Sequence, residues 1–188
     1  APADLTLGQA HAGVADAHLE AVVAALGDDL HVALGVGEAV LQQGLRSFPG
    51  LAHRMEQVGR AERVLFINDS KATNVGALDT ALSGMNGPVI LILGGKDKGG
   101  EFSCIVERHK SKIRKVFVIG EATARIMGEI SGIVDSQKAE DMQQAVSSAF
   151  ESARQGDVVL LSPGCASFDM FKSYEDRGDQ FKACVRNL

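Results

Sequence analysis

Residues 64–74 read VLFINDSKATN, four apolar residues followed at once by a polar turn. A continuous apolar run of this length is typical of a strand that is covered on both faces, as in a parallel sheet. The turn holds an anion, a cation and several hydroxyl and amide groups. In open α/β sheets, ligands bind beyond the carboxyl ends of the strands. This stretch therefore predicts a buried strand whose end carries a ligand-binding loop.

The rest of the chain after residue 49 repeats this pattern. Further apolar runs occupy residues 89–93, 116–119 and 158–161, and Ile133-Val134 is a candidate for a shorter strand. Helical patterns lie between them, and the clearest stripe comprises Met142, Ala145, Val146, Ala149, Phe150 and Ala153. Alternating strands and helices predict an α/β fold: a Rossmann-like, doubly wound, mostly parallel sheet of about six strands flanked by helices.

Both ends of this pattern carry weaker signals. A possible edge strand covers residues 54–58, and a last helix is predicted to carry Phe171, Tyr174, Phe181 and Val185. Before Pro49, apolar spacing predicts short helices near residues 19–26 and 38–45, although glycines weaken the second. We therefore expect an N-terminal helical segment, residues 1–47, and a separate domain, residues 48–188.

Composition excludes several functional classes. The net charge of -5 argues against a nucleic-acid binder, whose footprint would be a basic patch. The sequence has no apolar run long enough for a membrane span and no signal-peptide pattern, so we expect a cytoplasmic protein without a membrane partner. Three widely spaced cysteines favour free thiols, and the histidines show no metal-ligand spacing, so no metal site is expected in this chain.

Polar residues follow each predicted strand, and those at 68–74 carry the strongest signal. A helix N-terminus attracts carboxylate or phosphate, and Lys71 would strengthen that attraction. Asp69 could accept hydrogen bonds from a ribose or an amino group. A helix cap at Thr73 or Asn74 is the simpler interpretation, but it leaves Asp69 and Lys71 unexplained. Arg54 could bind phosphate or ribose, or it could be an exposed structural arginine.

Two other strand ends admit competing interpretations. The loop GGKDKGG at residues 94–100 resembles a phosphate cradle but is not a Walker A loop, and a plain strand-to-helix connection explains it about as well. Residues 162–169 contain Ser, Cys and Asp. A nucleophile is disfavoured there because no nucleophile-elbow motif is present and the other strand-end loops hold no histidine. Cys165 is more simply a small buried residue, and Ser167 suits a ligand hydrogen bond.

Together these segments resemble the C-terminal domain of the Mur ligases, most closely the branch that adds D-glutamate. The resemblance covers about residues 45–188 and rests on five blocks in order: FPGLAHRME (48–56), INDSKATN (67–74), GGKDKG (94–99), LSPGCASFDMF (161–171) and EDRGDQF (175–181). It implies that residues 1–47 end the preceding central domain. The chain has no P-loop and no UDP-binding domain, so it is expected to be inactive alone.

The resemblance also implies residue roles. Residues at the positions of Lys71 and Thr73 line the D-glutamate pocket, those at Lys98 and Ser167 contact its carboxylates, and those at Phe168 and Tyr174 form the pocket wall. Asn68, Asp69 and Arg54 match the segments that reach the nucleotide. The implied reaction uses ATP and Mg2+, bound mainly by a domain outside this chain, and UDP-N-acetylmuramoyl-L-alanine as the second substrate. A stand-alone nucleotide- or acidic-metabolite-binding module and a sister ligase for another amino acid remain alternatives.

Overall fold

The computed structural model describes residues 35, 37–96 and 98–188, and the chain divides into two compact units between Pro49 and Gly50. In the first unit, helix α2 (Glu38–Ser47) forms where the spacing over residues 38–45 predicts one. Gly44 lies inside this helix and does not end it. The helix expected near residues 19–26 lies outside the described residues.

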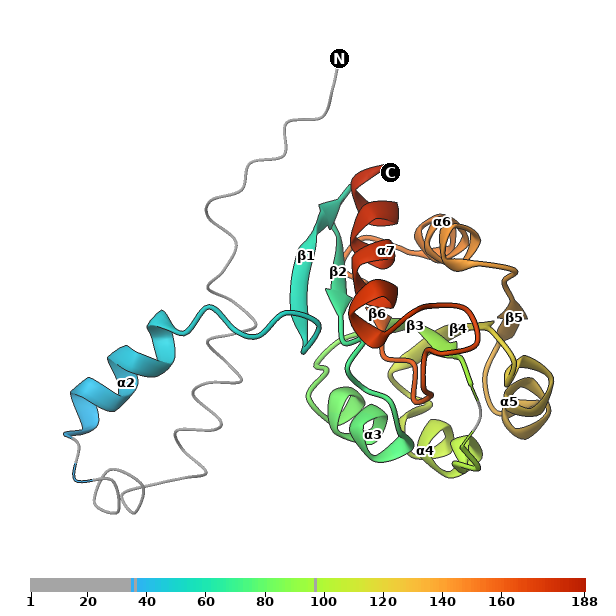
Figure 1. The fold of residues 1–188 in the computed structure, drawn as a ribbon, viewed down its shortest axis with the longest axis horizontal. Helices are drawn as coiled ribbons and strands as arrows, with labels where there is room; N and C mark the ends of the chain where they lie inside the picture. Colours follow the sequence, from blue (N-terminus) through green and yellow to red (C-terminus); the bar gives the residue numbers. More distant parts are fainter. Residues whose placement is uncertain (1–34, 36, 97) are drawn as a thin grey trace. The chain divides into compact units, whose positions relative to one another are not determined.

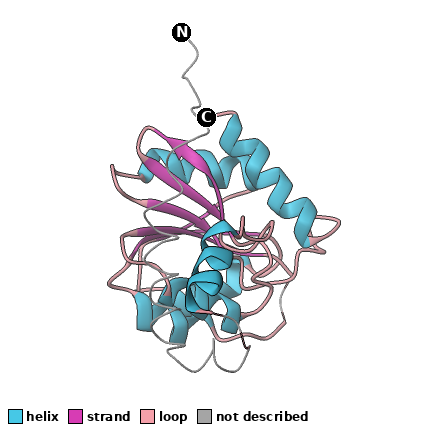
Figure 2. Cartoon of the chain, turned by 90° about the vertical axis from the view of Figure 1, so that its left-hand side faces the viewer, coloured by secondary structure: helices cyan, strands magenta, loops and turns pink. Residues whose placement is uncertain are grey.

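The second unit is built on one six-stranded sheet (Figures 1 and 2). Its strand order is β1-β2-β6-β3-β4-β5, with β1 antiparallel to β2 and every other neighbouring pair parallel. The strands are β1 (Glu56–Ala61), β2 (Val64–Asn68), β3 (Val89–Gly94), β4 (Ile113–Ile119), β5 (Ser136–Lys138) and β6 (Val158–Leu161). The predicted mostly parallel, doubly wound sheet of about six strands is confirmed.

Five helices cover the two faces of this sheet (Figure 1). One face packs against α3 (Val75–Ser83), α4 (Phe102–His109) and α5 (Thr123–Ile130), and the other against α6 (Met142–Ser152) and α7 (Tyr174–Arg186). Alternation along β2 shows why both faces need cover. Leu65 and Ile67 enter the first core, whereas Val64 and Phe66 enter the second. Strands buried on both faces read as continuous apolar runs, which is the pattern visible in the sequence.

Two predicted strands are shifted in the structure. The short fifth strand is Ser136–Lys138, and Ile133 and Val134 instead pack against the core on the α3–α5 face. The edge strand begins at Glu56, two residues later than predicted, because His53 and Met55 adopt left-handed backbone angles (φ 62° and 46°) that belong to a turn.

The last helix also begins later than its apolar pattern suggests. Phe171 lies in the preceding loop, and α7 begins at Tyr174. The Ser173 side chain caps it by accepting the Asp176 N–H (3.2 Å).

The order of the strands places two topological switch points beside the carboxyl end of β6. The loop after β6 leads to α7 on one face, whereas the loops after its neighbours β2 and β3 lead to α3 and α4 on the other. Chains that leave adjacent strands toward opposite faces open a crevice between them, and such switch points are where doubly wound sheets bind ligands. The candidate site is therefore expected around the loops after β2, β3 and β6.

Packing accounts for the first two glycines of the 94–100 loop. A Cβ on Gly94 would lie 2.0 Å from the Ile119 carbonyl oxygen, and one on Gly95 would lie 2.3 Å from the Ala166 carbonyl oxygen. Both glycines also have positive φ angles, 113° and 134°. These glycines let the loops after β3, β4 and β6 meet backbone to backbone, so a ligand is not needed to explain them.

We predict that Gly95→Ala destabilises the protein much more than Gly99→Ala. Both positions have positive φ, but a Cβ on Gly99 meets nothing within 4 Å. The left-handed backbone costs about 1–2 kcal/mol for a non-glycine residue. Overpacking at residue 95 adds about 1–3 kcal/mol. Urea unfolding of the two variants measures the difference, and equal losses would show that packing does not require Gly95.

Candidate functional site

Three strand-end loops are joined by hydrogen bonds around the loop after β6. Ser162 donates its hydroxyl to Asp69 Oδ2 (3.0 Å), and the Gly164 N–H donates to the Ala72 carbonyl (2.9 Å). On the other side, the Lys96 N–H donates to the Ala166 carbonyl (2.8 Å). The loops after β2 and β3 are therefore held at fixed positions on either side of residues 162–166.

The Arg177 side chain connects two of these loops from inside the protein. It is 0% exposed, the largest fully buried side chain among the described residues. Its guanidinium donates to the hydroxyl and carbonyl of Ser70 (2.9 and 2.8 Å) and to the Cys165 carbonyl (3.1 Å). Burial lowers the pKa of Arg177 to about 10, which leaves it charged at neutral pH. A buried cation therefore contributes positive potential directly behind the site.

Sequence reasoning missed Arg177, although a signal was present. It lies three residues after Tyr174 and four before Phe181, on the apolar stripe of the predicted helix. A charged residue on such a stripe predicts a buried, hydrogen-bonded cation.

The Asp69 carboxylate lies at the end of β2 and is only 7% exposed. Its Oδ1 accepts the Met55 N–H (3.3 Å) and its Oδ2 accepts the Ser162 hydroxyl. Burial raises the pKa of Asp69 to about 6, outweighing the two hydrogen bonds and the attraction of Arg54, which lower it. Such a perturbed carboxyl group at a switch point of the sheet marks a functional-site candidate.

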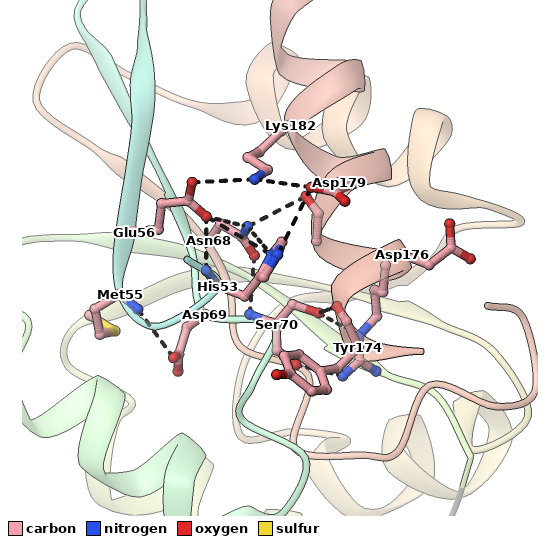
Figure 3. Close-up of polar contacts among 12 residues, drawn as sticks. His53, Met55, Glu56, Asn68, Asp69, Ser70, Tyr174, Asp176, Asp179 and Lys182 are labelled. Atoms are coloured by element: carbon pink, nitrogen blue, oxygen red, sulfur yellow. Dashed lines mark hydrogen bonds and ion pairs between the residues drawn. The ribbon is translucent and has the colours of Figure 1, made fainter. Parts of the chain in front are cut away.

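Asn68 and His53 lie behind Asp69 (Figure 3). Asn68 is 0% exposed, and its amide nitrogen lies within hydrogen-bond distance of His53 Nδ1 (3.0 Å), Glu56 Oε2 (3.0 Å) and the Gly178 carbonyl (3.4 Å). Its Oδ1 accepts the Ser70 N–H (3.1 Å). The Asn68 side chain is thus directed into the protein, whereas the sequence pointed to a contact with a nucleotide.

The pairing of β1 with β2 explains why sequence reasoning missed this cluster. The antiparallel register places Glu56 opposite Asn68. That register also brings His53, three residues before Glu56, against the loop after β2, where its carbonyl accepts the Lys71 N–H (3.0 Å).

Lys71, in the loop after β2, and Tyr174, at the start of α7, form a cation–aromatic contact. The Lys71 ammonium lies 3.8 Å from the centre of the Tyr174 ring, and both side chains are half-buried. The Tyr174 carbonyl accepts the Ser70 hydroxyl (2.7 Å), which anchors the start of α7 to the same loop. Asn74 is the cap of α3, accepting the Ala77 N–H (2.9 Å), so the capping interpretation is confirmed for Asn74.

The remaining predicted site residues lie on these same loops with different exposure. Lys98 is exposed after β3, Thr73 is half-buried after β2, and Arg54 is exposed in the turn before β1. Ser167 is buried at 2% and Phe168 is 70% exposed. Cationic, hydroxyl and aromatic groups therefore share the carboxyl edge of the sheet with one buried carboxyl group. This set of groups suits an anionic ligand with polar substituents.

Buried positions weigh against covalent chemistry at residues 162–169. Ser162 is fully buried and hydrogen-bonds Asp69, and Cys165 is 1% exposed, as expected for a small core residue. Within the described residues no three His, Cys, Asp or Glu side chains are grouped to hold a metal ion. In the same part of the chain, no helix has both the length and the apolar character needed to cross a bilayer.

Solved structures with this fold include ligases. The chain superposes on bifunctional folylpolyglutamate synthase/dihydrofolate synthase from Yersinia pestis with a TM-score of 0.57 at 16% identity, covering 80% of this chain and 35% of that one. It superposes on a murein peptide ligase from Psychrobacter arcticus with a TM-score of 0.52 at 16% identity, covering 83% and 35%. At such identities the likeness establishes the fold alone.

Curated proteins found by sequence comparison are more similar to this chain than these solved structures are. The chain is 47% identical over 160 residues to UDP-N-acetylmuramoylalanine–D-glutamate ligase of Hahella chejuensis, covering 83% of this chain and 36% of that protein. It is 48% identical over 161 residues to the enzyme of the same name from Nitrobacter hamburgensis, covering 84% and 34%. The chain thus spans about a third of the length of the curated relatives it matches.

The family comparison covers the site itself. The family described as "Mur ligase, glutamate ligase domain" matches residues 53–165, which is more than half of the chain and includes the loops after β2 and β3 and the start of the loop after β6. On this match, together with relatives at 47–48% identity, the chain belongs to the Mur ligase family, in its glutamate ligase domain.

Proposed function

We propose that this chain is the D-glutamate-binding, C-terminal domain of an ATP-dependent ligase that joins D-glutamate to UDP-N-acetylmuramoyl-L-alanine in peptidoglycan synthesis. The observation that carries the proposal is the 47–48% identity to ligases of that name across four fifths of the chain. The strand-end cations supply the chemistry that a dicarboxylate acceptor requires. Residues 1–47 would then belong to the preceding, central domain, and the enzyme would act in the cytoplasm.

The proposed acceptor pocket lies between the loops after β2, β3 and β6. Lys71 and Thr73 line it, and Lys98 and Ser167 bind the two carboxylates of D-glutamate. Phe168 and Tyr174 form its wall. Arg177, buried behind Ser70 and Cys165, adds positive potential without touching the ligand. Binding the two carboxylates at separate positions, Lys98 and Ser167, would fix which end of the amino acid presents its amine.

In the reaction, the domain would orient D-glutamate and help to keep water from the acyl phosphate. The D-glutamate nitrogen attacks the carbonyl carbon of the muramoyl-alanine acyl phosphate, the new C–N bond becomes an amide, and the C–O bond to phosphate breaks. Holding the amine in line with that carbon converts an encounter into a positioned reaction. Closing the domain against its neighbours excludes water, which would otherwise hydrolyse the acyl phosphate.

The proposed nucleotide contacts are Arg54 and Asp69. Arg54 is exposed and can reach a phosphate or ribose, and Asp69 carries a carboxylate suited to ribose hydroxyls. Asn68, being enclosed by protein groups, would act on the nucleotide only by holding Asp69 and its neighbours. ATP and Mg2+ would be bound mainly by the central domain and the UDP-linked substrate by the N-terminal domain, both outside this chain.

Lys98→Ala in the ligase that contains this chain is predicted to lower kcat/KM for D-glutamate by about 10- to 150-fold. This range corresponds to losing a hydrogen bond to a charged group, about 1.5–3 kcal/mol. Steady-state kinetics with D-glutamate varied, then with ATP varied, should show the loss mainly for D-glutamate. Lys110→Ala is the matched control, since Lys110 is exposed at the opposite end of α4.

A near-normal kcat/KM for D-glutamate in the Lys98 variant would overturn the assignment. Titrating the isolated 188-residue chain with ATP and with D-glutamate tests the alternative of a stand-alone binding module. Tight binding of either ligand by this chain alone would favour the module, because the ligase pocket is shared between domains. A preference of the ligase for another amino acid over D-glutamate would identify a sister enzyme.

Asp69→Asn is predicted to stabilise the chain at pH 8 while weakening nucleotide use by the ligase. The pKa of Asp69 is about 6 in the folded state against 3.8 for the unfolded chain, so the folded state holds the proton more tightly. Unfolding free energy therefore falls as pH rises from about 4 to about 6, by about 3 kcal/mol in total, and the asparagine variant avoids this loss. Asparagine can also keep both hydrogen bonds, accepting from Met55 and donating to Ser162.

Urea unfolding at pH 4 and pH 8 measures this difference, with the exposed Asp135→Asn as control. A stability gain at pH 8 that disappears at pH 4, combined with a raised KM for ATP, is the expected result. Lower stability at pH 8 would show that burial does not penalise the Asp69 charge.

A further inference from the structure

The Glu56 carboxylate, at the start of β1, lies next to the loop after β2 (residues 69–74). Its Oε2 accepts two N–H groups, the backbone N–H of His53 (2.9 Å) and the side-chain amide of Asn68 (3.0 Å). His53 and Asn68 each accept a further hydrogen bond from the loop after β2. His53 accepts the Lys71 N–H, and Asn68 accepts the Ser70 N–H. Glu56 lies outside the strand-end loops and therefore has no place in the proposed ligand contacts.

The first connection runs through the turn before β1. The His53 carbonyl accepts the backbone N–H of Lys71 (3.0 Å). Two residues later, the Met55 N–H donates to Asp69 Oδ1 (3.3 Å). The hydrogen bond from the His53 N–H to Glu56 therefore holds the turn at residues 53–55. This turn contacts Asp69 and Lys71, and it carries Arg54.

The second connection runs through the Asn68 side chain. Its amide nitrogen donates to Glu56, and its Oδ1 accepts the Ser70 N–H (3.1 Å). Ser70 in turn is the group that Arg177 and the Tyr174 carbonyl bind. Glu56 thus reaches the acceptor side of the site as well as the nucleotide side.

The turn needs such an anchor because its backbone is unfavourable. His53 and Met55 are not glycines, yet both have left-handed φ angles, 62° and 46°. Such a conformation is unfavourable for a residue with a Cβ and persists only where its surroundings hold it. The Glu56–His53 hydrogen bond, with a charged acceptor, is one of the contacts that hold it.

Helix α7 supplies the counter-charge that orients Glu56 (Figure 3). Lys182, whose side chain is 16% exposed, lies 3.3 Å from Glu56 Oε1 and 3.0 Å from Asp179 Oδ1. Burial opposes its charge, but the hydrogen bonds and attraction of Asp179 and Glu56 raise the pKa of Lys182. With Lys182 on Oε1, the oxygen Oε2 is left to face His53 and Asn68.

Gly178 allows α7 to come this close. A Cβ at this position would lie 2.2 Å from His53 Nδ1 and 3.0 Å from Asn68 Nδ2. A glycine inside a helix is less favourable than alanine, so the close approach compensates for a locally unfavourable residue.

We propose that Glu56 is a positioning residue for the ligand-binding loops and that Lys182 on α7 sets its orientation. Glu56 touches no ligand. It holds Asp69 and Arg54 for the nucleotide and Lys71 for the acceptor, through the His53 turn and the Asn68 amide. The inference rests on the proposed function, since it needs those three residues to bind ligands.

The first test is amide hydrogen exchange of the 188-residue chain. Glu56→Gln is expected to lower the protection of the His53, Met55, Ser70 and Lys71 amides by about tenfold or more, as for a lost hydrogen bond to a charged group. Lys115→Met is the control, because Lys115 on β4 forms an ion pair with the exposed Asp135 (3.5 Å), far from the loop after β2. Unchanged exchange in Glu56→Gln would overturn the inference.

The second test is kinetic, in the ligase that contains this chain. Glu56→Gln is expected to raise KM for both ATP and D-glutamate about fivefold or more. Adding Lys182→Met to Glu56→Gln should recover most of the loss. In Glu56→Gln alone, the glutamine NH2 group must face either the Lys182 ammonium or the N–H donors of His53 and Asn68, and both arrangements place donor against donor. Without Lys182, it can point outward and leave its oxygen for His53 and Asn68. A merely structural role would make the double variant worse than either single one.

Failure of the inference and failure of the proposed function give different results. If Glu56→Gln leaves both KM values unchanged while Lys71→Ala raises KM for D-glutamate, Glu56 has no positioning role and the proposed function stands. If Lys71→Ala also has no effect, the proposed acceptor site itself is wrong.

Discussion

The buried guanidinium of Arg177 is the constraint on which the site depends. A charged group removed from water is tolerated only when its donors are satisfied, and here they are satisfied by Ser70 and Cys165. These acceptors belong to the loops after β2 and β6, so the two loops must lie beside each other for the cation to be buried. Two further hydrogen bonds, from Ser162 to Asp69 and from Gly164 to Ala72, join the same two loops. The loops at this edge of the sheet are thus joined around a charge that is buried within the protein.

Several features of the site make sense only as costs accepted for function. Asp69 is buried with a pKa raised to about 6, and the turn beside it holds two non-glycine residues in left-handed conformations. A carboxyl group that is costly to ionise, next to strained backbone, is common at binding sites and rare in a structural core. The Glu56–Lys182 pair and the close approach of Gly178 show how α7 offsets part of that cost.

Sequence reasoning recovered the architecture well, whereas the proposed ligand contacts stay predictions. Continuous apolar runs identified β2, β3, β4 and β6, because strands buried on both faces leave no polar alternation. It shifted β5, since Ser136–Lys138 is a polar edge strand without an apolar signature. For the glycines at 94–95 it left a phosphate cradle and a plain strand-to-helix connection open, and their neighbours prove to be the carbonyl oxygens of Ile119 and Ala166. Local patterns cannot distinguish a close ligand from a close backbone.

What the sequence by itself determined is the doubly wound sheet, its polar carboxyl edge and the family to which these loops belong. Those features are local, being set by periodicity and by residues adjacent in the chain. Only the tertiary structure decided which polar groups at this edge are exposed and which are enclosed by protein groups. Asn68, beside Asp69 in sequence, points inward because the antiparallel β1 brings Glu56 opposite it. Arg177 and Lys182 join the site from more than a hundred residues away, because α7 packs across β1 and β2 and buries their charges against partners that no spacing rule connects.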